Sequence, residues 1–241
     1  MSASPVSFSL SGDALNCVRY VGSFRELVET PFEGMVNAIC WKRELVGDFD
    51  EIVSVIGELD EITTLEEDDL QSLDLSEPGA VARDRLIEDL ALLRGAGLEP
   101  SLDCIPGYPR SAVEGAVPVD VYDFHADSAT EPMDTYLCSY TVACSEGARN
   151  ADVQRYVDFP HVRAAVLAEY GGEDDAGFLE FLRERFYDLH YRMRAGASAY
   201  SFGFGNMWRI ATLCPGSPVP PCIHRAPTTR PGDPARLLLI S

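Results

Sequence analysis

Two histidines and one carboxylate, drawn from two distant segments, are the residues of this sequence best suited to chemistry. His125 and Asp127 lie two positions apart in the segment 121–127, and His224 lies in the segment 221–227. Two imidazoles and one carboxylate can hold Fe(II) on one face and leave other positions of the metal open. Residues two apart on one strand face the same side. The pattern therefore predicts an Fe(II) site formed by His125, Asp127 and His224.

The small number of histidines favours this interpretation. The chain has only four, and the other two, His161 and His190, fall in a stretch whose apolar spacing predicts helices. His125 and His224 instead stand at the ends of predicted β segments. The alternative stays open that both are ordinary core histidines and that Asp127 is a surface carboxylate.

The order of these residues resembles that of Fe(II)/2-oxoglutarate-dependent dioxygenases. In that family an H-x-D pair is followed by a distal histidine, and then by an arginine that binds the far carboxylate of the cosubstrate. His125-x-Asp127, His224 and Arg236 follow this order. The chain also resembles an uncharacterised bacterial family known only as a domain of unknown function, through short motifs such as Asn37–Arg43, Phe124–Asp127, His224–Pro227 and Arg236–Leu239.

The first resemblance implies a reaction and two cofactors. Fe(II) and 2-oxoglutarate would be bound, O₂ consumed, and oxidative decarboxylation coupled to hydroxylation or related C–H oxidation of a small, for example amino-acid-like, metabolite. Arg236 would bind the distal carboxylate, and Tyr136 and Tyr140, which share a strand face, could hydrogen-bond it. Halogenases of this type usually carry a small residue in place of the aspartate, so Asp127 argues against halogenation.

One position departs from the family and keeps alternatives open. The family often has Ser or Thr two residues after the arginine, where this chain has Leu238. A metal- or ligand-binding β-barrel without oxygenase activity, or a metal enzyme that uses no 2-oxo acid, would fit this departure. Other residues could then contact the carboxylate or the substrate, and the candidates are Trp208, Arg209, Arg225 and Arg230.

The elements that must position these residues follow from composition and periodicity. Residues 1–97 are predicted to be a mainly helical N-terminal part, with helices over 48–59 and 76–95 and a buried strand over 36–41. Residues 98–241 are predicted to form an antiparallel β region that a helical insertion interrupts at about 150–195. The expected strands are 102–105, 117–125, 135–143, 199–204, 207–213, 222–224 and 235–240.

We therefore expect a single α+β domain built on a double-stranded β-helix, a cupin-like jelly roll with a ligand site at its mouth. The insertion is expected to contain one helix over 161–170 and a longer helix that ends near Gly196.

Composition restricts the class of partner. The formal net charge of −20 argues against nucleic acid and against anionic membranes, because both are polyanions. No apolar run approaches the roughly 20 residues that span a bilayer, and the first residues do not have the pattern of a signal peptide. Seven cysteines at scattered spacings are typical of reduced thiols. The sequence thus predicts a cytoplasmic protein that acts on a small molecule.

Overall fold

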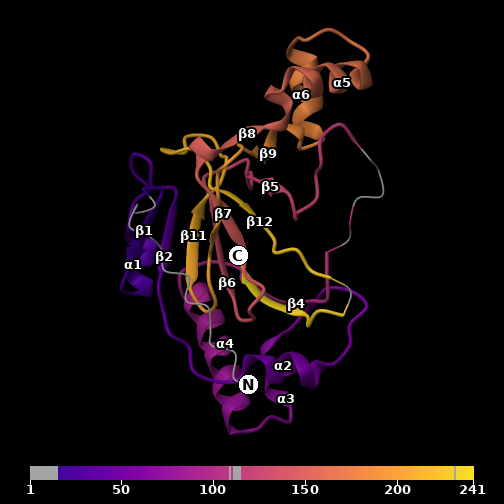
Figure 1. The fold of residues 1–241 in the computed structure, drawn as a ribbon. Coiled ribbons are helices and arrows are strands. Elements are labelled where there is room, and N and C mark those ends of the chain that lie inside the picture. Colours follow the sequence, from indigo (N-terminus) through magenta and orange to yellow (C-terminus); the bar gives the residue numbers. More distant parts are fainter. Residues whose placement is uncertain (1–15, 109, 111–114, 231) are drawn as a thin grey trace.

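The computed structural model describes residues 16–108, 110, 115–230 and 232–241, and it is an α+β structure with two sheets (Figure 1). Among these residues the only parallel pair of strands is β1 with β2. Sheet A contains, in spatial order, β1 (Val18–Val21), β2 (Ala38–Trp41), β11 (Met207–Ala211), β6 (Asp134–Ser139), β13 (Arg236–Ile240), β4 (Ser101–Ile105) and β3 (Thr63–Thr64). Sheet B contains β10 (Tyr200–Ser201), β7 (Glu146–Ala148), β12 (Ile223–Arg225), β5 (Phe124–His125), β9 (His190–Met193) and β8 (Val153–Arg155).

Four helices from the N-terminal part pack against sheet A. They are α1 (Phe24–Glu29), α2 (Phe49–Ile56), α3 (Glu67–Ser72) and α4 (Glu77–Gly95). The side chain of Ser76 caps α4 by accepting from the Gly79 N–H, as expected for a serine at this position. Leu86, Leu90 and Leu93 recur at helical spacing and are buried in the core that α4 shares with sheet A. No described helix is long and apolar enough to cross a membrane.

The two faces of sheet A belong to different cores. On β13, Leu237 and Leu239 join the core on the helical side, whereas Leu238 joins the core that contains Phe202 and Cys222. This alternation follows from the two-residue period of a strand. Because the second core combines residues of both sheets, we call the face of each sheet that points into it the inter-sheet face.

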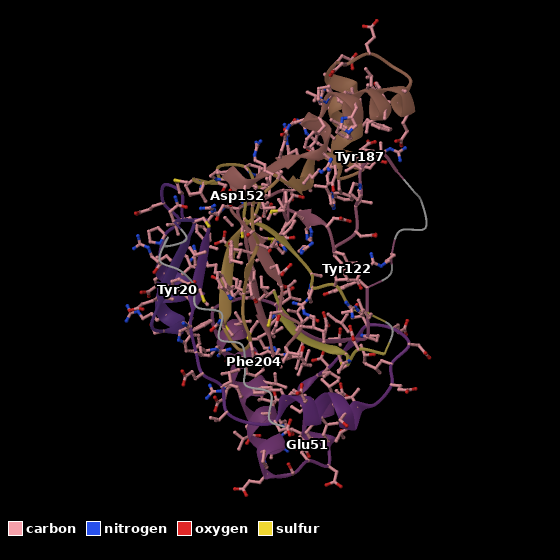
Figure 2. The ribbon with its side chains drawn as sticks, in the orientation of Figure 1. Tyr20, Glu51, Tyr122, Asp152, Tyr187 and Phe204 are labelled. Carbon is pink, nitrogen blue, oxygen red and sulfur yellow. The ribbon has the colours of Figure 1, made fainter. Side chains whose placement is uncertain are left out.

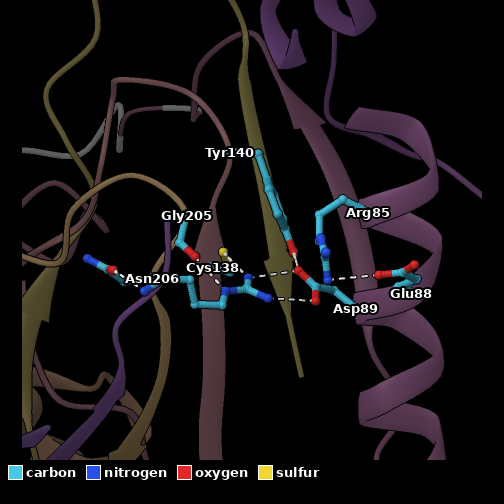
Figure 3. A network of polar contacts seen from close by, with 8 residues as sticks. Arg85, Glu88, Asp89, Cys138, Tyr140, Gly205 and Asn206 are labelled. Atoms are coloured by element: carbon cyan, nitrogen blue, oxygen red, sulfur yellow. Dashed lines mark hydrogen bonds and ion pairs between the residues drawn. The ribbon is translucent and has the colours of Figure 1, made fainter. Parts of the chain in front are cut away.

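A buried ion pair joins the N-terminal part to the sheet. Arg43 donates from Nη1 and Nη2 to the two carboxylate oxygens of Asp89 on α4, at 2.7 Å each (Figure 3). Tyr140, just after β6, donates to Asp89 Oδ2 at 2.5 Å, and Arg43 Nε donates to the Gly205 carbonyl at 2.8 Å. Asp89 is fully buried. Four segments far apart in sequence are thereby held at one point.

The helical insertion has a core of its own. The 3₁₀ turns η1 (Asn150–Asp152), η2 (Tyr156–Asp158) and η3 (Tyr187–Leu189) flank α5 (Pro160–Tyr170) and α6 (Ala176–Glu184). These helices project beyond β8 and β9 at the end of the molecule opposite α3 (Figure 1). Their apolar side chains Val157, Val162, Val166, Phe178, Leu182 and Tyr187 form a cluster, which Val117 from the segment before β5 joins.

Several predicted elements are shorter in the structure, among them the strand predicted over 199–204, which is reduced to β10. The strand predicted over 117–125 is reduced to β5, because the Asp123 N–H donates to the Asp120 carbonyl in a turn. The longer helix predicted to reach Gly196 ends at Glu184. Phe186 adopts a left-handed conformation, with φ of 59°, and the chain then enters β9. His190, predicted to be helical, is therefore the first residue of a strand.

Gly147 on β7, directly opposite His224 on β12, provides a test of packing between the two sheets. A Cβ at this position would lie 2.4 Å from Tyr200 Cζ and 2.7 Å from Phe202 Cε1. We expect Gly147→Ala to lower the free energy of unfolding by about 1–3 kcal/mol, since overpacking forces neighbouring rings to move. Urea denaturation would measure it. Gly95→Ala, where nothing lies within 4 Å of the added Cβ, should instead leave stability equal or raise it; similar losses in both variants would contradict the packing argument.

Candidate metal centre

β12 lies between β5 and β7 in sheet B, and this pairing brings the two distant histidines together. His224 is directly opposite His125 in the antiparallel register, and side chains at directly opposite positions share a face. Their ring centroids are 4.6 Å apart. Phe202, in the inter-sheet core, lies with its ring centroid 6.4 Å from that of His224. The two imidazoles therefore project from sheet B toward the space between the sheets.

Asp127 completes the group just beyond β5. Its backbone carbonyl accepts the N–H of Leu213 at 2.8 Å, which fixes this turn against the end of β11. Its Oδ2 accepts a hydrogen bond from Thr135 on β6 at 2.7 Å. Its Oδ1 lies 3.9 Å from His125 Nε2 and 3.7 Å from His224 Nε2. One ligand atom from each of the three residues lies within 4.8 Å of the others.

A hydrogen bond to the backbone leaves the ligand atom of His125 available. The carbonyl of Asp123 can only accept, so its 2.8 Å contact with His125 Nδ1 requires a proton on Nδ1 and leaves a lone pair on Nε2. This is the arrangement usual for histidines that ligate metals. His224 Nδ1 is buried and has no hydrogen-bond partner in the described part of the protein.

The charge states also suit a metal ligand set. Burial, followed by the neighbouring His224, lowers the pKa of His125 to about 4. For Asp127, burial raises the pKa, but His224 and the hydrogen bond from Thr135 outweigh it, so the pKa lies below its ordinary value. At neutral pH His125 is neutral and Asp127 is ionised, which are the forms that bind metal ions.

The spacing of the three atoms fits a cation between them. Metal bonds to imidazole and carboxylate are about 2.0–2.2 Å long, which places neighbouring ligand atoms about 3.0–3.5 Å apart. The 3.7 and 3.9 Å separations need only a small inward movement. They are also too long for Asp127 Oδ1 to hydrogen-bond either imidazole. A metal ion between the three atoms would give each of them a shared partner.

Arg236 is the second unusual group of the inter-sheet face. Its side chain is almost completely buried. Its Nη1 donates to Tyr108 Oη at 3.3 Å, and its Nη2 donates to Ser139 Oγ at 2.9 Å and Ser145 Oγ at 2.7 Å. Its Nε has no hydrogen-bond partner among the described residues. Among the residues that the structure describes, no carboxylate forms an ion pair with it, and burial lowers its pKa.

A buried charge without a counter-charge is unfavourable, because desolvation of the guanidinium is not offset by hydroxyl partners alone. A bound carboxylate would supply both the missing charge and an acceptor for Nε. The surroundings of Arg236 therefore favour an anionic ligand.

The other predicted site residues lie elsewhere. Tyr136, Tyr140 and Arg209 point to the helical side of sheet A, where Tyr140 binds Asp89 and Arg209 binds Asp134 and carbonyls at the end of α1. Trp208 is on the inter-sheet face but is buried against Phe202, with ring centroids 4.4 Å apart. Arg225 pairs with Glu146 on the opposite face of sheet B. Arg230 is exposed. None of these residues is brought together with His125, Asp127 and His224.

Sequence reasoning missed the hydroxyls that contact Arg236 and Asp127. Thr135 and Ser139 alternate with Leu137 on the inter-sheet face of β6, so the choice of the tyrosines rested on the wrong face of the same strand. The spacing of Thr135, Leu137 and Ser139 at every second position was available in the sequence, but the face that points inward was not. Tyr108 and Ser145 lie outside the strands and gave no such signal.

Comparison with known proteins adds no family to this description. No protein-family model, curated protein or solved structure matches the chain. Function must therefore be inferred from the side chains themselves: a His–Asp–His group that could hold a metal ion, and a buried arginine that no carboxylate of the described residues pairs with.

Proposed function

We propose that this protein is a non-haem Fe(II) oxygenase that couples oxidative decarboxylation of 2-oxoglutarate to hydroxylation, or related C–H oxidation, of a small molecule. One observation carries the proposal. The inter-sheet face of β6 contacts the His–Asp–His group, through Thr135 and Asp127, and the buried Arg236, through Ser139. Within the described part of the chain no carboxylate pairs with this arginine. A ligand with a chelating end and an anionic end fits such a pair.

The order of the strands supports a jelly-roll core for this function. The relevant eight strands are, in chain order, β4, β5, β6, β7, β10, β11, β12 and β13. Numbered one to eight, they follow the order 6-3-8-1 in sheet A and 5-4-7-2 in sheet B. This order is the one expected of a double-stranded β-helix made of two Greek keys. β1, β2 and β3 then lengthen sheet A, and β8 and β9 enter with the helical insertion.

The residues of the chain divide the work of binding. His125, Asp127 and His224 would hold the iron on one face, and bound Fe(II) with 2-oxoglutarate would supply the activation of O₂. Arg236 would pair with the distal carboxylate in a charge-assisted contact, and Tyr108, Ser139 and Ser145 would orient it. These three hydroxyls would take the place of the Ser or Thr hydroxyl that the family often has at the position of Leu238.

Anaerobic titration tests the proposal directly. Fe(II) and then 2-oxoglutarate are added to the apo protein, and the weak visible charge-transfer band of the chelated 2-oxo acid is expected to appear. The absence of metal binding would overturn the proposal. Metal binding without the band would favour a metal enzyme that uses no 2-oxo acid, or a metal-binding barrel without oxygenase activity.

Arg236→Ala tests the anionic end of the ligand. We expect the Kd for 2-oxoglutarate, measured from the same band, to rise about 10–100-fold, because hydrogen bonds to a charged partner contribute about 1.5–3 kcal/mol. Arg236→Lys should retain part of the affinity, since it keeps the charge but loses the paired geometry. Arg225→Ala, on the opposite face of sheet B, is the control and should bind normally. An unchanged Kd in Arg236→Ala would exclude this role.

A further inference from the structure

A third histidine stands in line with the two predicted metal ligands. His190 on β9 is directly opposite His125 on β5, which is in turn opposite His224 on β12. The three therefore form a row across sheet B on one face. The ring centroids of His125 and His190 are 5.8 Å apart. His190 is buried, but it lies outside the group whose ligand atoms are within 4.8 Å of one another.

The ring of His190 is oriented in the same way as that of His125. Its Nδ1 lies 2.8 Å from the carbonyl oxygen of Phe186. Since a carbonyl only accepts, Nδ1 carries the proton, and in the neutral ring Nε2 carries a lone pair. This donation from Nδ1 to a backbone carbonyl is the second contact that metal-bound histidines usually make. Here it prepares Nε2 as a hydrogen-bond acceptor beside His125.

The carbonyl that orients His190 is itself held in an uncommon conformation. Phe186 follows the end of α6 with φ of 59°, and it is the only non-glycine residue with positive φ among the described residues. The left-handed conformation is unfavourable for a bulky side chain, and such residues cluster at functional sites. At this position it ends the helix and directs the Phe186 carbonyl to the His190 ring, so the insertion fixes the orientation of His190.

We propose that His190 is the outer member of the metal centre, a positioning residue whose Nε2 accepts a hydrogen bond from a water molecule on the open face of the bound metal. The inference rests on the metal site of the proposed function. A substrate hydroxyl or ammonium group that replaced this water would donate to the same nitrogen. His190 would thus select substrates that carry an O–H or N–H donor next to the carbon that reacts.

Two near-isosteric replacements separate this role from simple packing. Asn at this position places its amide near the site of Nδ1, so His190→Asn can keep the donation to Phe186 but loses the acceptor. Gln reaches the site of Nε2, so His190→Gln can restore the acceptor but loses the contact with Phe186. His161→Ala, a histidine exposed on α5, is the control for the loss of an imidazole.

The probe is Co(II), whose affinity and visible spectrum report on the centre without any substrate. At one fixed pH, His190→Ala and His190→Asn should raise the Kd for Co(II) about tenfold or more and alter its visible band, as is usual for lost outer contacts. His190→Gln should stay within about threefold of the unaltered protein, and His161→Ala should equal it. Circular dichroism and thermal unfolding of the apo proteins show whether each variant is folded.

The possible outcomes are distinguishable. If the unaltered protein binds no Co(II), the metal site of the proposed function fails. If it binds Co(II) and His190→Ala and His190→Asn bind it equally well with an unchanged spectrum, the role of His190 fails and the proposed function stands. If His190→Asn binds Co(II) like the unaltered protein and His190→Gln binds it weakly, His190 acts through its contact with Phe186, and the acceptor role is excluded. If both bind it equally weakly, restoring the acceptor does not restore affinity, and the acceptor role is excluded as well.

Discussion

Replacement of Asp127 by alanine is expected to abolish Fe(II)- and 2-oxoglutarate-dependent turnover and to weaken Fe(II) binding by more than about 100-fold. Changes to outer contacts of a metal site alone cost about 10–100-fold, and Asp127 is the only carboxylate of the group. Its loss would leave two imidazoles, and a divalent cation would lose its only anionic ligand. Succinate release and Fe(II) affinity would be measured together.

Two matched variants are expected to affect Fe(II) binding less than Asp127→Ala does. Thr135→Val removes the hydrogen bond to Asp127 Oδ2 but keeps the ligand, so a loss of about 10-fold in Fe(II) affinity is expected. Asp84→Ala removes an exposed carboxylate of α4 and should leave affinity and turnover unchanged. Wild-type turnover in Asp127→Ala would show that the metal assignment is wrong.

Replacement of Asp89 by alanine is expected to lower the free energy of unfolding by about 3–5 kcal/mol. Removing one partner of a buried ion pair leaves the other charge desolvated and unpaired. Here the abandoned partner is Arg43, whose side chain is buried and donates to both Asp89 oxygens. Tyr140 would lose its acceptor as well. Guanidinium denaturation at fixed pH would measure the change.

The neighbouring residue provides the control. Glu88, one position earlier on α4, forms an exposed pair with Arg85 (Figure 3). Surface pairs of this kind contribute about 0–1 kcal/mol, so Glu88→Ala should change stability by less than about 1 kcal/mol. A loss of equal size in both variants would mean that the helix, and not the buried ion pair, is responsible. Figure 2 shows that Glu51 of α2 and Tyr187 of the helical insertion lie toward opposite ends of the molecule.

Elements with strong local signals were predicted correctly from the sequence. The apolar stripe and the serine cap predicted α4, and the β-branched and aromatic run predicted β6, although it ends at Ser139 and not at residue 143. The presence of two helices in the insertion was also predicted. These signals depend on neighbours within a few residues, which is why they can be read without a structure.

The parts that failed depend on partners that are distant in sequence. Phe186 ends α6 without the glycine that usually marks such a position, so His190 was assigned to a helix and its place beside His125 was missed. The face of β6 that points toward sheet B could not be determined from alternation alone, because both faces are buried. The convergence of His125, Asp127 and His224 was predicted from residue chemistry, whereas the hydroxyls around Arg236 required the fold.

The position of β12 has a consequence for the order of folding. This strand is the only described link between the pair β10–β7 and the group β5–β9–β8. The two parts of sheet B cannot be joined until β12 inserts between β5 and β7, which lie much earlier in the sequence. Pairings between strands so far apart in sequence form slowly. The amide protons of β5 and β7 should therefore gain protection from hydrogen exchange in the same kinetic phase as those of β12. We therefore expect the candidate site to form together with the pairing of β12.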